Sequence, residues 1–209
     1  MEIIPTKQFS LQLPNNGGCS VIMIGSGRSG KTTALGYLLH KYFSKHIGIL
    51  MTNSPQANIY KDMDIIQAPK YCPKVFKDMY TINKNTNNHY QFLAVLDDVT
   101  TGIKFDKELQ KALTIYRNSQ ISVIQNIQAI TLLNTAGRTN ATFVFLFKLN
   151  TDEQIEKAVK WYLSSYFPPN TKMADKIRYY RESTEDHYFF VIDSLNYNVF
   201  RTKINIDDE

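Results

Sequence analysis

Cysteine is scarce in this chain of 209 residues, and the shortage excludes several classes of protein. Cys19 and Cys72 are too few for a disulfide framework, and they do not have the spacing of a zinc motif. The four histidines, at positions 40, 46, 89 and 187, also lack paired ligand spacing, so no zinc site is expected. This cysteine content fits a reducing compartment.

Long apolar runs are absent as well. No stretch approaches the roughly 20 apolar residues that a membrane-spanning helix needs. The start of the chain, MEIIPTKQFS, has an acid at position 2 and no long apolar core, so a signal peptide is not expected. Internal repeats, low-complexity blocks and Pro/Gly/Ser linkers are missing, and we expect one domain over residues 1–209.

The composition is that of a globular protein with a mild excess of positive charge. Hydrophobic residues make up 43% and charged residues 21% of the chain. There are 24 Lys and Arg against 19 Asp and Glu, a formal net charge of +5. Such an excess suits a polyanionic partner, but it does not identify one.

Short strand-like apolar runs alternate with segments of helical period. This alternation predicts an α/β fold with a mostly parallel sheet covered by helices on both faces. The expected strands are Val21–Ile24, Ile47–Met51, Phe92–Leu96, Ile121–Ile127, Thr142–Leu149, Tyr188–Ile192 and Asn198–Ile204. The last two lie close together, with SLNYN between them, so they are expected to form a C-terminal hairpin.

Three helices are expected from apolar stripes that repeat at i, i+3, i+4 and i+7. The stripes are Leu35-Leu38-Leu39-Tyr42, Leu109-Ala112-Leu113-Tyr116 and Ile155-Ala158-Val159-Tyr162. Before the third stripe, Thr151 and Gln154 have the spacing of a capping box. Prolines at positions 168 and 169 end that segment, because proline cannot continue a helix.

The segment GSGRSGKTT, residues 25–33, follows the first expected strand and matches the phosphate-loop pattern G-x-x-x-x-G-K-[ST]. Its glycines let backbone amides turn toward phosphate oxygens, where a side chain would collide. We expect Lys31 to reach the β- and γ-phosphates and the Thr32 hydroxyl to ligate Mg²⁺. The expected nucleotide-binding residues are Gly25, Ser26, Gly27, Arg28, Ser29, Gly30, Lys31, Thr32 and Thr33.

An acidic pair follows the third expected strand, in the pattern of a Walker B motif. Asp97 is expected to hold Mg²⁺ through water, and Asp98 to polarise the attacking water as a general base. Most ATPases of this kind carry Glu at the second position, and Asp is one methylene shorter.

The strand expected at 121–127 has polar residues at its end. In P-loop ATPases with an additional strand, that strand lies between the phosphate-loop strand and the Walker B strand. Gln128 or Asn126 would then be placed to sense the γ-phosphate or the attacking water. The alternative for each is a solvated loop amide.

Four segments together resemble the poxvirus-type genome-packaging ATPases, a viral branch of the FtsK/HerA superfamily of DNA translocases. They are GSGRSGKTT, FLAVLDDV, YRNSQISVIQNIQ and GRTNATFVFLFK, within residues 20–150. The resemblance implies a RecA-like sheet and an ATP-hydrolysing motor that drives double-stranded DNA into a capsid. ATP and Mg²⁺ are the cofactors that it implies.

The same resemblance implies partners and a location. The partners are double-stranded DNA, viral capsid or membrane vertex proteins, and further copies of this chain in a hexameric or pentameric ring. The expected location is the host-cell cytoplasm at sites of virus assembly, with the virion as a second one.

A ring motor needs a cation supplied across a subunit boundary, because charge develops on the γ-phosphoryl group in the transition state. Arg117, just before the additional strand, and Arg138 are the candidates, and a surface or helix-capping cation is the alternative for each. The stretch 160–181 mixes basic and aromatic residues that would suit DNA, although an exposed helix face is the simpler interpretation.

Two other functions are compatible with a phosphate loop. A nucleoside or nucleotide kinase would need a lid rich in arginine, and no such cluster lies between the later strands. A nucleotide-gated scaffold that docks the genome or the capsid without turnover stays open, because Asp98 stands where Glu is usual.

Overall fold

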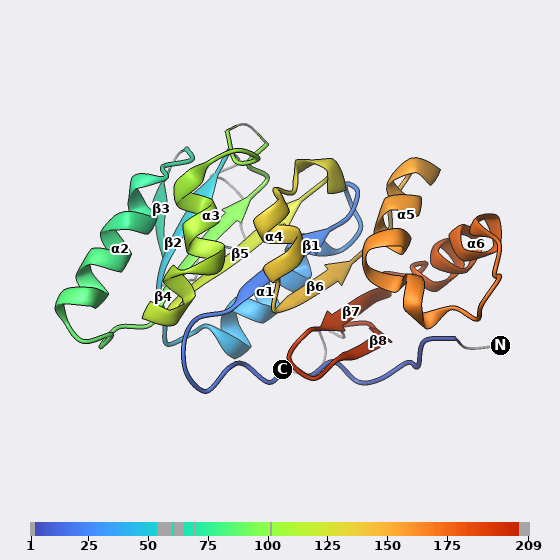
Figure 1. Ribbon diagram of the computed structural model, residues 1–209, viewed down its shortest axis with the longest axis horizontal. Coiled ribbons are helices and arrows are strands. Elements are labelled where there is room, and N and C mark those ends of the chain that lie inside the picture. Colours follow the sequence, from blue (N-terminus) through green and yellow to red (C-terminus); the bar gives the residue numbers. More distant parts are fainter. Residues whose placement is uncertain (1–2, 54–59, 61–64, 69, 101, 205–209) are drawn as a thin grey trace.

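One eight-stranded sheet organises the part of the chain that the computed structural model describes, which is residues 3–53, 60, 65–68, 70–100 and 102–204 (Figure 1). The strand order is β3-β2-β4-β5-β1-β6-β7-β8. The strands are β1 Ser20–Ile24, β2 Ile47–Thr52, β3 Ile65–Ala68, β4 Phe92–Asp97, β5 Ile121–Ile127, β6 Phe143–Leu146, β7 Phe189–Asp193 and β8 Asn198–Thr202. β1 to β6 pair in parallel, and β7 and β8 join antiparallel at one end.

Helices cover both faces of this sheet. α1 lies on one face, and α2, α3 and α4 lie on the other (Figure 1). The helices are α1 Lys31–Tyr42, α2 Lys74–Asn85, α3 Lys107–Thr114, α4 Thr135–Asn140, α5 Asp152–Ala158 and α6 Met173–Ser183. The expected α/β architecture is therefore confirmed.

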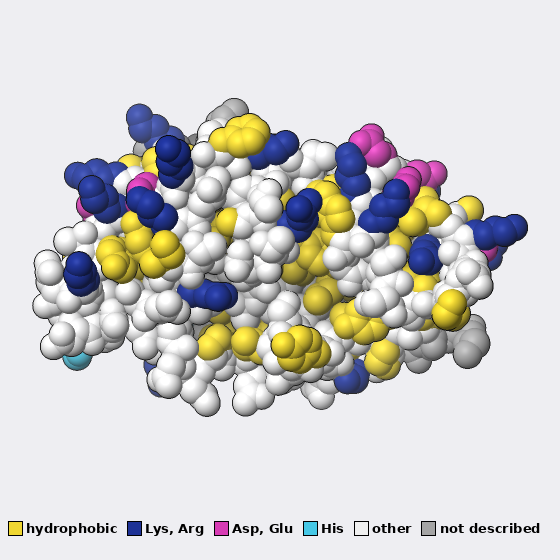
Figure 2. All heavy atoms as spheres, in the orientation of Figure 1, with side chains coloured by type: hydrophobic (Ala, Val, Ile, Leu, Met, Phe, Trp, Pro, Cys, Tyr) yellow, Lys and Arg dark blue, Asp and Glu magenta, His cyan; other side chains and the backbone are white. Residues whose placement is uncertain are grey.

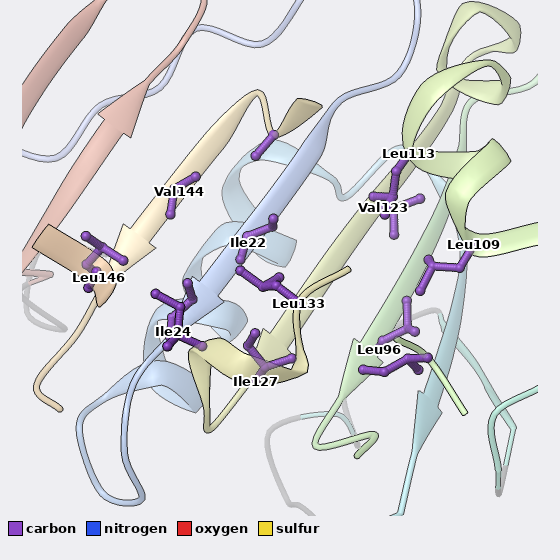
Figure 3. Packing of buried hydrophobic residues seen from close by; sticks show 14 of the residues in the cluster. Ile22, Ile24, Leu96, Leu109, Leu113, Val123, Ile127, Leu133, Val144 and Leu146 are labelled. Carbon is purple, nitrogen blue, oxygen red and sulfur yellow. The ribbon is translucent and has the colours of Figure 1, made fainter. Parts of the chain in front are cut away.

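The central strand β1 explains why the core has two layers. Successive side chains of a strand point to opposite faces. Val21 and Met23 accordingly belong to the apolar cluster under α1, and Ile22 and Ile24 belong to the cluster on the other face. In Figure 3, Ile22 and Ile24 lie beside residues of β5 and β6, and α3 covers the β4–β5 part of the same layer. Burial on both faces accounts for the unbroken apolar run in the sequence.

β5 lies between β4 and β1, which is the place expected of the additional strand. In the registers, Asn126 is opposite Asp97 on one side and Met23 on the other. The three strands are parallel, so their carboxyl ends meet at one edge of the sheet. The phosphate loop and the acidic pair both leave the sheet at that edge.

Several elements differ from the sequence-based expectation. β3, α2, α4 and α6 were not predicted, and the expected strand ends are shifted by one to three residues in β6, β7 and β8. The third expected helix is wrong at its end, because the α-helix stops at Ala158 and a π-helical turn, Val159–Leu163, follows. Thr151 does cap α5, since its side chain accepts a hydrogen bond of 3.4 Å from the Gln154 amide.

The basic and aromatic stretch at 160–181 is mainly a packed and ion-paired surface. Tyr180 is fully buried, and its hydroxyl donates to the Phe147 carbonyl at 2.6 Å. Arg181 pairs with Asp152 at 2.6 Å, and the other pairs in the stretch are Lys160–Glu156 and Arg178–Asp175. The simpler of the two interpretations fits this arrangement.

The expected C-terminal hairpin is confirmed as β7–β8, and residues 5–7 run along its outer strand. Thr6 forms a parallel bridge with Arg201. The Lys7 amide donates to the Arg201 carbonyl at 2.9 Å, and the Arg201 amide donates to the Pro5 carbonyl at 2.8 Å. Among the described helices, none has both the length and the apolarity to cross a membrane.

Candidate nucleotide-binding and hydrolysis site

The phosphate loop connects β1 to α1 and is fastened to the strands beside it. The Gly25 amide donates to the Ile127 carbonyl at 3.3 Å, and the Ser26 amide donates to the Lys148 carbonyl at 2.9 Å. A Cβ atom on Gly25 would lie 2.5 Å from Cβ of Phe147, so this position requires glycine. The loop is thus held in direct contact with the end of β5 and with the residues that follow β6.

Gly30 begins the helix that follows the loop. Its φ of 92° lies in the left-handed region, which glycine adopts at little cost. α1 then starts at Lys31, with Thr32 and Thr33 exposed in its first turn. The free amides and the positive end of α1 face the loop, as an anion site requires.

Lys31 is buried, and its ammonium group is turned into the loop. Its Nζ donates to the carbonyl oxygens of Gly25 at 2.6 Å and of Ser26 at 2.8 Å. Burial lowers the pKa of Lys31, and the charges of Asp98 and Asp97 oppose that change. The lysine is therefore within electrostatic reach of both acids, as the expected site requires.

Asp97 is the buried acid of the pair, with 6% of its surface exposed. Its Oδ2 accepts a hydrogen bond of 2.6 Å from the Tyr60 hydroxyl, and its Oδ1 accepts one of 2.6 Å from Nδ2 of Asn126. Burial raises the pKa of Asp97, and the two hydrogen bonds act in the opposite direction. Each carboxylate oxygen already has one donor, with room for further lone-pair contacts.

Asp98 follows the end of β4 and turns its carboxylate toward β5. Its φ is 56°, a left-handed conformation that Asp tolerates better than most residues. Its amide donates to the Asn126 carbonyl at 3.1 Å, and its carbonyl accepts from Nδ2 of Asn53 at 3.3 Å. Oδ1 accepts a hydrogen bond of 2.6 Å from Nε2 of Gln128. The expected general base and the expected sensor are therefore in direct contact.

The arginine candidates lie elsewhere in the chain. Arg117 is in the 3₁₀ turn Tyr116–Ser119 just before β5, so it lies at the amino edge of the sheet, opposite the phosphate loop. The seven residues of β5 separate the two edges by about 20 Å. Arg138 is in α4, with its guanidinium 4.7 Å from the centre of the Trp161 ring. Arg117 therefore cannot reach the phosphate loop of its own chain.

The loop offers what a phosphate group needs. Ser29 is buried, and its Oγ has no hydrogen-bond partner within the described residues. A Cβ atom on Gly27 would meet no atom within 4 Å, so the loop is open there. An unpaired donor and an open concave turn fit the oxygens of a triphosphate.

The residues at this edge also fit Mg²⁺. The described part of the chain has no group of three or more His, Cys, Asp and Glu side chains able to hold a metal by themselves. Mg²⁺ in nucleotide sites usually takes one or two protein oxygens and completes its shell with phosphates and water. The Thr32 hydroxyl and the Asp97 carboxylate are hard oxygen donors of that kind.

Sequence reasoning did not find Tyr60, Asn53, or the residues around His187. Each is brought to the site by the fold and belongs to no local motif. Tyr60 lies 37 positions before its partner Asp97, and nothing in its neighbourhood signals a role. His187 has its Nδ1 atom 3.4 Å from the position that a Cβ atom on Gly30 would take.

No family model matches the sequence, and no curated protein matches it. Solved structures do resemble it. The genome packaging NTPase B204 from Sulfolobus turreted icosahedral virus 2, in complex with AMPPCP, is 14% identical with a TM-score of 0.63 over 92% of this chain and 100% of that chain. The DNA-packaging ATPase B204 from Sulfolobus turreted icosahedral virus is 14% identical with a TM-score of 0.59 over 91% of this chain and 100% of that chain.

A conjugation coupling protein is similar to the same degree. The monomer form of TcpA from pCW3, with ATPγS, is 14% identical with a TM-score of 0.63. The match covers 99% of this chain and 67% of that chain. Likeness at such identities shows the fold alone. The chain has the RecA-like P-loop NTPase fold of the additional-strand type, with a mostly parallel sheet between helices and a C-terminal hairpin.

Proposed function

We propose that this chain is an ATP-hydrolysing translocase that packages double-stranded viral DNA, acting as a single P-loop ATPase domain over residues 1–209. The observation that carries the proposal is the meeting of Lys31, Asp97 and Asp98 at one sheet edge, beside the end of β5. Neighbours in fold include a viral DNA-packaging ATPase and a conjugation coupling protein. The motif set of the poxvirus-type packaging ATPases, a branch of the FtsK/HerA superfamily, points in the same direction.

Phosphate binding would change the partners of Lys31. Its ammonium donates to two carbonyl oxygens, and phosphate oxygens are charged and form stronger hydrogen bonds. The loop amides of residues 25–33 would bind the remaining oxygens. The buried lysine would thereby recover the electrostatic stabilisation that it loses by burial.

Thr32 and Asp97 would hold Mg²⁺. When bound, Mg²⁺ neutralises charge on the β- and γ-phosphates. Tyr60 and Asn126 hold the Asp97 carboxylate in one orientation, and they stabilise its charge in a buried place. They would thereby orient a metal ligand without touching the metal themselves.

Asp98 would accept a proton from the attacking water, and Gln128 would fix the orientation of the Asp98 carboxylate. The hydrogen bond from Nε2 of Gln128 leaves Oδ2 of Asp98 for the water. The left-handed backbone at Asp98 turns the side chain away from the buried strand. Aspartate is one methylene shorter than the usual glutamate. The hydrogen bond from Gln128 would hold this shorter side chain in one orientation.

The transition state needs a further cation, and we propose that a neighbouring subunit supplies it from Arg117 or Arg138. Arg117 lies at the amino edge, so a ring contact would have to bring that edge to the phosphate loop of the next subunit. Mixing Lys31→Ala subunits with Arg117→Ala or with Arg138→Ala subunits tests this role. The arginine that acts in trans is the one whose alanine variant is inactive alone and regains activity when mixed with Lys31→Ala subunits, because those subunits supply the intact arginine. Neither mixture should regain activity if no arginine crosses the boundary.

DNA, capsid or membrane vertex proteins, and further copies of the chain in a pentameric or hexameric ring are the proposed partners. Figure 2 shows Lys and Arg side chains spread over the face that carries α2 to α6, with fewer acids between them. Scattered cations meet phosphates without reading bases, which suits passage of any sequence. The proposed location is the host-cell cytoplasm at sites of virus assembly, and also the virion.

ATP hydrolysis with and without double-stranded DNA, at low salt, tests the proposal. DNA should stimulate hydrolysis, and Lys31→Ala and Asp98→Asn should each abolish the stimulated rate. Gel filtration with an ATP analogue and DNA should show an oligomer. A monomeric protein whose rate of ATP hydrolysis does not change with DNA would contradict the proposal of a motor. Phosphate transfer to nucleosides, with no effect of DNA, would support a kinase instead.

One observation favours a nucleotide-gated scaffold as the second candidate. Both oxygens of Asp97 accept hydrogen bonds from Tyr60 and Asn126, and Asp98 stands where ATPases usually have glutamate. A site arranged in this way can bind nucleotide without hydrolysing it. Single-turnover measurement of ATP hydrolysis in the assembled complex separates the scaffold from the motor.

A further inference from the structure

A cavity of about 560 Å³ lies beside the phosphate loop. Arg28 and Ser29 of the loop form one side, and residues 184–188 with Lys203 form the other. Lys148, which follows β6, lines it as well. Its volume is within the range of about 300–1,000 Å³ that is common for small-molecule sites. Because two loop residues line it, the cavity lies next to the expected phosphate site.

The sheet order places this cavity on a defined side of the nucleotide. Asp97 and Asp98 leave β4, which is two strands from β1 in one direction. The cavity is formed at the ends of β6, β7 and β8, which lie in the other direction. If Asp97 and Asp98 act at the γ-phosphate, that end of the triphosphate lies toward β4. The nucleoside half then extends in the opposite direction, toward β7.

The wall opposite the loop is aromatic and held in an uncommon conformation. Asp186 and His187 are consecutive residues with φ of 52° and 64°, and neither is glycine. Left-handed backbone of this kind costs free energy and gathers at functional sites. Next to it, Tyr188 is half-buried, with the Arg201 guanidinium 3.7 Å from the centre of its ring.

Charged groups surround the aromatic wall. Nζ of Lys148 donates to both carboxylate oxygens of Glu185 at 2.9 Å, which fastens the 185–188 turn to the end of β6. Arg28 and Lys203 add positive charge, and Asp186 adds an acceptor. Cations suit an α-phosphate, carboxylates accept hydrogen bonds from ribose hydroxyls, and flat rings stack on a base.

We propose that this cavity binds the nucleoside half of the triphosphate, the base with its ribose, and that the 185–188 turn supplies the surface that the base contacts. The inference rests on the proposed nucleotide site. His187 lies closest to the loop, next to Gly30. Its ring and that of Tyr188 form the surface on which the base lies.

Calorimetric titration of the full chain with ATP and, separately, with inorganic triphosphate tests this assignment. The wild type should bind ATP about tenfold more tightly than triphosphate, a difference typical of base stacking on an aromatic ring. His187→Asn keeps a residue that tolerates left-handed backbone and removes the ring. It should lose that advantage for ATP and keep the affinity for triphosphate.

Two controls make the outcomes distinct. His89→Asn changes an exposed histidine outside the cavity and should leave both affinities unchanged. Tyr188→Leu should weaken ATP alone, and circular dichroism would show whether it still folds. If wild type and His187→Asn bind ATP and triphosphate equally, the subsite is wrong and the phosphate site stands. If the wild type binds neither ligand, the proposed function fails and the subsite fails with it.

Discussion

The Tyr60 hydroxyl and the Asp97 carboxylate form a hydrogen bond of 2.6 Å in the interior, with the phenol as donor. Tyr60 is 1% exposed, so its hydroxyl has been taken out of water. Burial and the neighbouring charge of Asp97 both raise the pKa of Tyr60, which keeps the phenol protonated and able to donate. The pair thus orients the acid that would hold Mg²⁺.

Replacing this tyrosine tests its positioning role. Tyr60→Phe removes the donor and keeps the ring, so we expect the half-saturating Mg²⁺ concentration for hydrolysis to rise by about tenfold. The maximal rate at saturating Mg²⁺ should change less. Tyr179→Phe is a matched control, because its hydroxyl accepts from the Ile4 amide and not near the site. Identical Mg²⁺ dependence in Tyr60→Phe and wild type would contradict the role.

Asp97 is expected to lower stability at neutral pH. Its pKa in the folded chain is above the ordinary value of 3.8, so the folded state binds the proton more tightly than the unfolded state. Stability therefore falls as pH rises from 3.8 through the raised pKa, and the loss is complete above it. Asp97→Asn should melt at a higher temperature than wild type at pH 7, despite losing hydrolysis.

The pH dependence of melting checks the sign of that effect. Differential scanning fluorimetry of both proteins should show the advantage of Asp97→Asn shrinking as the pH falls toward 3.8. It should vanish below that value, where aspartate is protonated in both states. An advantage that grows on acidification, or a lower melting temperature at pH 7, would show that the acid stabilises the fold.

Two glycines of the loop should respond differently to alanine. Gly25→Ala places a Cβ atom 2.5 Å from Cβ of Phe147 and 2.8 Å from Oγ of Ser29, so it should lower the free energy of unfolding by about 1–3 kcal/mol. A Cβ atom on Gly27 meets nothing within 4 Å. Gly27→Ala should unfold like wild type in urea and bind ATP more weakly. Equal stability of the two variants would contradict the packing.

Gln128 is expected to act through Asp98. Gln128→Ala removes the donor to Oδ1 and should lower kcat by about tenfold with little change in KM, since hydrogen bonds to charged groups have about this effect. Gln128→Glu should be slower still, because it sets a second carboxylate beside the base. Gln91→Ala, exposed just before β4 at the opposite edge, serves as the control. Unchanged kcat in Gln128→Ala would make the amide a solvated loop residue.

The features that could be predicted from the sequence are those determined by interactions between residues close together in the chain. Residues 25–33 turn at a strand end because of their own glycines, and the acidic pair follows a run of buried strand residues. Both patterns place their residues at the carboxyl edge once the strands are parallel. The position of β5 between β4 and β1 was expected from P-loop ATPases with an additional strand, not from the residues themselves, and it is confirmed.

The missed parts depend on contacts between distant segments. Tyr60 contacts Asp97 across 37 positions of the chain, and no periodicity in the sequence records that contact. β3 has only four residues, and the polar Gln67 interrupts its short apolar run. The π-helical turn after Ala158 changes the spacing that the apolar stripe assumes.

The strip of chain at residues 5–7 hides the hydrogen-bonding groups of β8 that would otherwise face solvent. The outer strand of the hairpin therefore depends on residues 5–7 for part of its backbone hydrogen bonding. A bulky fusion placed before residue 5 would loosen the last strand, and through Arg201 it would disturb the ring of Tyr188.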